Sequence, residues 1–131
     1  MKRQLSTRED VQFLVNSFYA QVREDATLGR IFNRIVHDWP THLERLGDFW
    51  EMVLLQSGPG AGKFSPVPVH KEVDRTFNRQ LEQAHFEHWL GLWFGTVDTY
   101  FEGEVADYAK EHAGRMAQIL FFRIMEGRAQ D

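Results

Sequence analysis

Apolar side chains recur at steps of three and four residues along this chain, the spacing of one face of an α-helix. No run of alternating apolar and polar residues indicates a strand, so the sequence predicts an all-α fold. The predicted inward positions of four helices are Val11, Leu14, Val15, Phe18, Tyr19 and Val22; Leu43, Leu46, Phe49, Trp50, Val53 and Leu54; Phe86, Trp89, Leu90, Trp93, Phe94, Val97 and Phe101; and Val105, Tyr108, Ala109, Met116, Ile119 and Leu120.

Polar residues placed before these stretches predict where helices begin. Thr7 and Asp10 have the spacing of a capping box, and Asp38 precedes a Trp-Pro pair that suits a first helical turn. Asp25 is a cap candidate for a short connecting helix, which contains Gly29. The predicted helices are therefore joined by short connections, with one exception.

That exception is the segment SGPGAGKFSPVPVH, which has three glycines and three prolines and ends at His70. Such a composition excludes a long regular element. Loops of this length are uncommon in small domains and are often functional. We therefore predict a single domain over residues 1–131, in which a loop at 57–69 precedes His70.

Composition excludes several classes of protein. The chain has no cysteine, which excludes disulfides, zinc-thiolate sites, iron–sulfur clusters, thiolate-ligated haem and haem attached through cysteine. Its net charge of −4 and scattered basic residues argue against nucleic acid or an anionic membrane as partner. No apolar run approaches the roughly 18 residues of a membrane span, and no signal peptide is recognisable, so we expect a cytoplasmic protein.

Histidine is the remaining strong metal ligand, and a structural or surface role is the ordinary explanation for most histidines. That explanation serves for His37, His85, His88 and His112. Although His85 and His88 could chelate a metal from one helical face, no third ligand of recognisable spacing accompanies them.

His42 shares an apolar helical face with Leu46 and Phe49, so its ring is expected to point inward, where it needs a partner or a ligand. Tyr19 and Trp89 lie on two other inward faces, and each has one hydrogen-bond donor on a large apolar body. Core packing explains each residue singly. Three donors on three inward faces, together with a histidine after a proline-rich loop, form a more specific set.

The segments FYAQVREDATLGRIF, HLERLGDFW, PVPVH and HFEHWLGLWFGTVDTYFEGEVADYAK resemble group III truncated haemoglobins in their order and spacing. The resemblance extends from about residue 10 to residue 120. It implies a truncated globin-like, two-over-two helical sandwich around a non-covalent haem b. It also implies that His70 is the proximal iron ligand and that Tyr19, His42 and Trp89 are the distal hydrogen-bonding residues.

A haem at this site would give further residues a role. Phe49 and Trp50 match positions where the family has haem-packing and core aromatics. His42 could also reach the iron as a sixth ligand. Arg45 is a candidate partner for a haem propionate, although a solvated arginine explains it equally well.

The implied function is binding of oxygen or a related small ligand (nitric oxide, carbon monoxide, peroxide or cyanide) at a histidine-ligated iron. Donors around a charged ligand favour slow oxygen release. A peroxidase-like or nitric-oxide-detoxifying enzyme, supplied by an unidentified reductase, is the alternative. A helical interaction module without a cofactor is the third hypothesis.

Overall fold

The structure is a computed structural model that describes residues 2–58 and 83–130, with side chains up to Glu126. His70 and residues 59–69 of the predicted loop lie outside the described residues. The elements, in chain order, are β1 (Arg3–Gln4), α1 (Arg8–Glu24), α2 (Leu28–Ile35), α3 (Trp39–Leu55), α5 (Gln83–Tyr100), β2 (Phe101–Glu102) and α6 (Glu104–Gln130). The predicted all-α character is confirmed.

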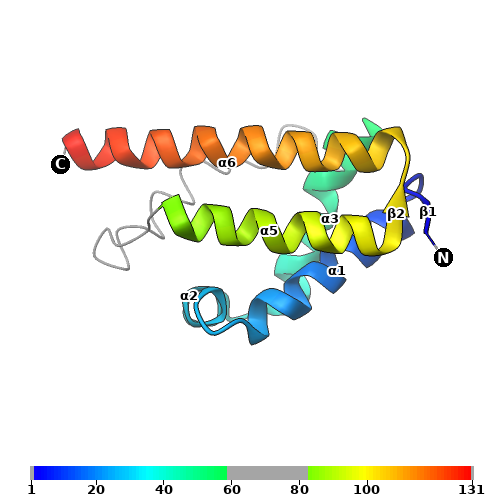
Figure 1. Ribbon diagram of the computed structural model, residues 1–131. Coiled ribbons are helices and arrows are strands. Elements are labelled where there is room, and N and C mark those ends of the chain that lie inside the picture. Colours follow the sequence, from blue (N-terminus) through cyan, green and yellow to red (C-terminus); the bar gives the residue numbers. More distant parts are fainter. Residues whose placement is uncertain (1, 59–82, 131) are drawn as a thin grey trace.

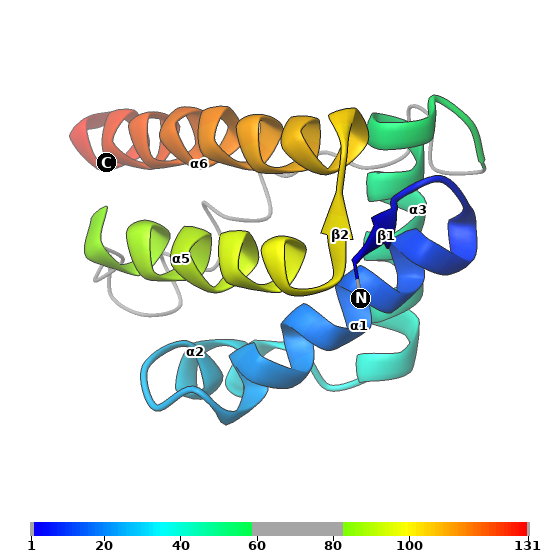
Figure 2. The same cartoon turned by 45° about the vertical axis from the view of Figure 1, so that its right-hand side comes forward.

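Two helix pairs make up the fold. Helices α5 and α6 run antiparallel and side by side, and α1 lies against α5 (Figure 1). Helix α3 packs on α1 and also reaches α6 (Figure 2). Helix α1 is thus the central element, because α2, α3 and α5 all pack on it.

The sequence of α1 accounts for its place in the centre. All six positions predicted to face inward are buried, and the capping box at its start is present. Asp10 N–H donates to the Thr7 hydroxyl over 3.1 Å, and Thr7 N–H donates to the Asp10 carboxylate over 3.2 Å. The predicted beginning and buried face of this helix are both confirmed.

Polar side chains fix how α3 lies on α1. The Arg8 guanidinium donates to Asp48 and to Glu51, each over 2.7 Å. The Gln12 amide donates to the Leu43 carbonyl oxygen over 3.0 Å. The predicted cap of α3 is also present, since the Asp38 carboxylate accepts from Thr41 N–H over 3.2 Å.

The prediction that the chain has no strand is wrong at one small point. Strands β1 and β2 pair in parallel, with Arg3 opposite Phe101 and Gln4 opposite Glu102. Pairs of two residues are too short to produce an alternating pattern, so sequence periodicity cannot reveal them. Gly103 follows with a φ of +103°, a left-handed conformation that glycine adopts without strain and that lets the chain turn into α6.

Three large side chains predicted to face inward are exposed: Phe94 at 38%, Tyr108 at 40% and Ile119 at 54%. On α5, Trp93, Thr96 and Val97 are buried instead of Phe94. For Tyr108 and Ile119 residue size explains the error, because the buried stripe of α6 consists largely of small residues. Alanine lets two helices approach closely, so the stripe faces the core at positions that carry little hydrophobic signal. Its members are Ala106, Ala109, Ala113, Ala117, Leu120 and Ile124.

Asp25, predicted as the cap of α2, instead ends α1, and Thr27 stands directly before α2. The Asp25 carboxylate nevertheless joins three elements. One carboxylate oxygen accepts from Thr27 N–H over 3.0 Å and from Leu28 N–H over 2.9 Å. The other accepts from His88 Nε2 of α5 over 2.6 Å. The corner between α1 and α2 is thereby tied to the helix that carries Trp89.

We predict that acid weakens this corner. The Leu28 N–H and the His88 imidazole hold the pKa of the Asp25 carboxyl below its ordinary value. A carboxyl of this kind stabilises the folded chain above about pH 4, and the contribution is lost as the pH falls through the folded pKa. Urea unfolding across the acid range should show a shallower pH dependence for Asp25→Asn than for wild type.

His88→Gln is the matched variant, because it removes the ring but leaves the backbone hydrogen bond from Leu28 to Asp25, the larger cause of the lowered pKa. It should keep most of the acid dependence. An Asp25→Asn variant whose stability depends on pH as steeply as that of wild type would contradict this account.

Candidate functional site

Three residues predicted as distal donors lie together in the structure. Tyr19 comes from α1, His42 from α3 and Trp89 from α5. The Tyr19 and His42 rings are 6.2 Å apart between centroids and nearly perpendicular, at 84°. The Trp89 indole N–H acts as a hydrogen-bond donor toward the Tyr19 hydroxyl. The fold thus brings together side chains that are 70 positions apart in the sequence.

Tyr19 is the most deeply buried of the three, at 5% exposed. Burial raises the pKa of its hydroxyl to about 12, and the Trp89 hydrogen bond offsets only part of that effect. The hydroxyl is therefore protonated at neutral pH. Its oxygen accepts a hydrogen bond from Trp89.

Aromatic rings surround this hydroxyl. Tyr19 contacts Phe18, Phe32 and Trp39, with ring centroids 4.7, 5.8 and 6.0 Å away respectively. Trp39 also lies 5.6 Å from the His42 ring. An apolar surrounding of this kind strengthens any hydrogen bond made to the site.

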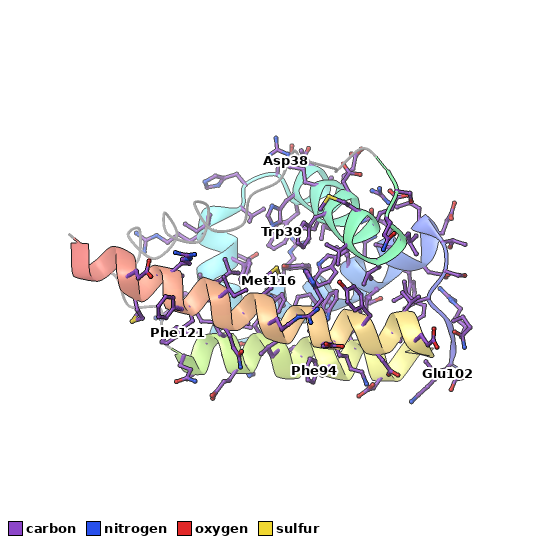
Figure 3. The ribbon with its side chains drawn as sticks, turned by 90° about the horizontal axis from the view of Figure 1, so that it is seen from above. Asp38, Trp39, Phe94, Glu102, Met116 and Phe121 are labelled. Carbon is purple, nitrogen blue, oxygen red and sulfur yellow. The ribbon has the colours of Figure 1, made fainter. Side chains whose placement is uncertain are left out.

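Sequence analysis did not identify Trp39 and Phe32 as site residues. Trp39 stands directly after a helix cap, where it signals only the first helical turn. In Figure 3, Trp39 on α3 and Met116 on α6 lie on facing sides of the interior, whereas Phe94 lies on the outer side of α5. The crossing of the helices decides which side of the interior an aromatic residue lines. A local sequence pattern does not contain that information.

Phe49 and Trp50 lie further along α3, and both are buried. Trp50 is only 2% exposed and stacks on Trp93 of α5, with centroids 4.6 Å apart and planes at 24°. The two rings next to it are Phe49 at 5.4 Å and His112 at 5.7 Å. Trp50 is therefore a core aromatic at the contact between α3, α5 and α6.

Arg45 lies on the exposed side of α3. Hydrogen bonds from Thr41 lower the pKa of the Asp38 carboxyl, and the charge of Arg45 adds to that effect. This position is that of a solvated arginine at the edge of the helix. A role toward a haem propionate stays a prediction.

The other histidines are spread over the molecule. His88 binds Asp25, His37 is exposed, and burial, together with the charge of Arg115, lowers the pKa of the half-buried His112. Within residues 2–58 and 83–130 no group of three or more metal-ligating side chains is present. His70, the predicted iron ligand, lies outside these ranges.

Comparisons with known proteins agree with the resemblance in the sequence. No family model matches the chain. A group 3 truncated haemoglobin of Campylobacter jejuni is 29% identical over 121 residues, which cover 89% of this chain and 90% of that protein. The crystal structure of a group III truncated haemoglobin from Campylobacter jejuni superposes with a TM-score of 0.82, with 26% identity and 95% of both chains covered. The predicted two-over-two truncated-globin fold is therefore confirmed.

The sequence was expected to contain no membrane-spanning segment, and the described helices agree with this. None of the described helices is both long enough and apolar enough to cross a bilayer.

Proposed function

We propose that this chain, a homologue of the group 3 truncated haemoglobins that shares their fold, holds a haem and binds a small oxygen-containing ligand at its iron. A haem with one protein ligand leaves the opposite position of the iron open to such a molecule. The observation that carries the proposal is the buried, protonated Tyr19 hydroxyl, which accepts from Trp89 and whose ring lies against His42.

The residues described on this side of the site fit a haem ligand. Tyr19, His42 and Trp89 provide one hydroxyl, one imidazole and one indole N–H within an aromatic surrounding. Hydrogen-bond donors in such a surrounding stabilise an atom that gains negative charge.

Each of the three residues has a separate task in this proposal. Trp89 donates to the Tyr19 oxygen and so turns the hydroxyl proton away from itself, toward the ligand. Tyr19 donates that proton in a hydrogen bond without losing it, because its pKa is about 12. His42, whose ring meets that of Tyr19 edge-on, closes the third side of the site and limits the entry of water.

His70 is the residue we assign to the iron, on the strength of the sequence. Purified protein titrated with haemin is expected to develop a Soret band, and His70→Ala should release haem much more readily than wild type. A ligand that binds only the folded state stabilises it. The rise in melting temperature on adding haemin should therefore be smaller for His70→Ala than for wild type.

His37→Ala is the matched control, since His37 is exposed and distant in sequence from the loop. It should keep the wild-type Soret band and thermal shift. A protein that develops no Soret band would exclude the proposed function, and the cofactor-free helical module would then explain the fold.

Reduction of peroxide is a second candidate, and one observation favours it. The Trp89 ring is stacked with that of Trp93, with planes at 3° and centroids 6.0 Å apart, and Trp93 is itself stacked on Trp50. A row of easily oxidised rings beside the ligand site suits electron transfer more than simple storage of oxygen.

A further inference from the structure

A row of aromatic rings begins with the stacked tryptophans beside the ligand site and continues through His112 to Tyr108 at the molecular surface. From Trp89 the row passes to Trp93 over 6.0 Å and to Trp50 over 4.6 Å, measured between ring centroids. Trp50 lies 5.7 Å from His112, and His112 lies 5.8 Å from Tyr108. The inner members are sealed from solvent, because Trp93 is 0% and Trp50 is 2% exposed.

The outer end of the row is open. Tyr108 on α6 is 40% exposed, so a molecule in solution can contact its ring. The positively charged Arg115 guanidinium lies 5.9 Å from the centre of that ring. Tyr108 is therefore the point at which the buried row of rings meets solvent.

Tryptophan and tyrosine are the side chains that lose an electron most readily. Electron exchange between rings falls steeply with distance, so several short steps are faster than one long step. We propose that Trp89, Trp93, Trp50, His112 and Tyr108, which we name the aromatic relay, carry electrons from phenolic or aromatic-amine reductants at Tyr108 to the ligand site. This inference rests on the proposed function, in its peroxide-reducing form.

Hydrogen peroxide at the haem takes up two electrons and two protons, its O–O bond breaks, and two molecules of water form. Each electron leaves Tyr108, whose phenolic proton passes to water, so that a neutral tyrosyl radical remains. A reductant that carries an O–H or N–H hydrogen then returns one electron and one proton to Tyr108. His112 bridges Tyr108 and Trp50 and is not itself oxidised, because imidazole is harder to oxidise than either neighbour.

Tyr100 provides a matched control within the same molecule. It is 38% exposed, almost the same as Tyr108. Its ring contacts Phe13, with centroids 4.9 Å apart, and phenylalanine is far harder to oxidise than tryptophan. Only three tyrosines are present in the chain, so a radical on Tyr108 can be told apart from one on Tyr100 or Tyr19.

The experiment uses haem-loaded protein, with loading verified by the Soret band, and adds hydrogen peroxide in the presence of a nitroso spin trap. Peptide mass spectrometry then locates the trapped radical, and electron paramagnetic resonance records the tyrosyl signal. We expect the adduct on Tyr108 and not on Tyr100. Tyr108→Phe should abolish the tyrosyl signal, whereas Tyr100→Phe should leave it unchanged.

Trp50→Phe tests the middle of the relay. Phenylalanine keeps an aromatic ring against Trp93 but is harder to oxidise, so the Tyr108 adduct measured per bound haem should be lost. If this variant does not fold, the comparison of Tyr108→Phe with Tyr100→Phe still decides whether the relay operates.

Haem-loaded protein that consumes peroxide with no adduct on Tyr108, or with equal adducts on both tyrosines, overturns the relay and leaves haem binding intact. Failure to load haem instead overturns the proposed function, and the relay with it.

Discussion

Replacing Tyr19 by phenylalanine is expected to raise the rate of oxygen dissociation by about ten- to a hundredfold, which corresponds to the loss of about 1.5 to 3 kcal/mol from one hydrogen bond to a charged acceptor. Oxygen bound to ferrous haem acquires negative charge, and the buried hydroxyl is the donor best placed to stabilise it. Phenylalanine keeps the ring contacts with Phe18 and Trp39, so the change removes the hydroxyl, which is both the donor to the ligand and the acceptor for Trp89, and preserves the packing.

Stopped-flow displacement of oxygen by carbon monoxide measures this rate. Tyr100→Phe makes the same chemical change on the surface and should leave the rate unaltered. Because the pKa of Tyr19 is about 12, the wild-type rate should not change between neutral pH and about pH 10. An unaltered dissociation rate in Tyr19→Phe would show that the hydroxyl does not reach the ligand.

The acidity of Tyr19 also links the site to stability. Its folded pKa lies above its ordinary value of 10.0, so the neutral hydroxyl stabilises the folded chain at all lower pH values. That contribution is lost as the pH rises from about 10 through the folded pKa. The donor is thus present, and stable, over the whole range in which a haem protein would be assayed.

Helices with one clear apolar stripe were predictable from the sequence alone. In α1 the six inward positions, the cap at Thr7 and the partner at Asp10 all agree with the structure. Each of these features is local, because helical spacing and cap geometry involve residues only three or four positions apart. The same is true of the cap at Asp38.

Features that depend on how helices cross were not predictable in this way. The spacing of Tyr108 and Ile119 suggested an inward direction, yet α6 buries a row of alanines instead. Trp39 gave only the signal of a helix start, yet its ring lies 5.6 Å from His42 in the candidate site. The approach between Tyr19 and Trp89 could be stated beforehand only because the segments that contain them resemble a known family.

Gly29 weakens the helical pattern in the sequence, and in the structure it allows a close contact between two helices. A glycine inside a helical stretch weakens the helix, which is why the sequence indicated only a short connecting helix there. In the structure Gly29 is buried where α2 meets the end of α1. A Cβ atom at this position would lie 2.5 Å from the Arg23 carbonyl oxygen and 3.1 Å from the Val22 carbonyl oxygen.

Gly29→Ala is therefore expected to destabilise the protein by about 1 to 3 kcal/mol, because backbone atoms cannot move aside as a flexible side chain can. Any shift of α2 also displaces Phe32 from Tyr19, so ligand dissociation should accelerate along with the loss of stability.

Gly91→Ala is the matched control. A Cβ atom at Gly91 would contact nothing within 4 Å, and alanine there should stabilise α5 by about 0.5 to 1 kcal/mol. Urea unfolding of the two variants measures both effects, and equal midpoints would contradict a close contact between α2 and α1 at Gly29.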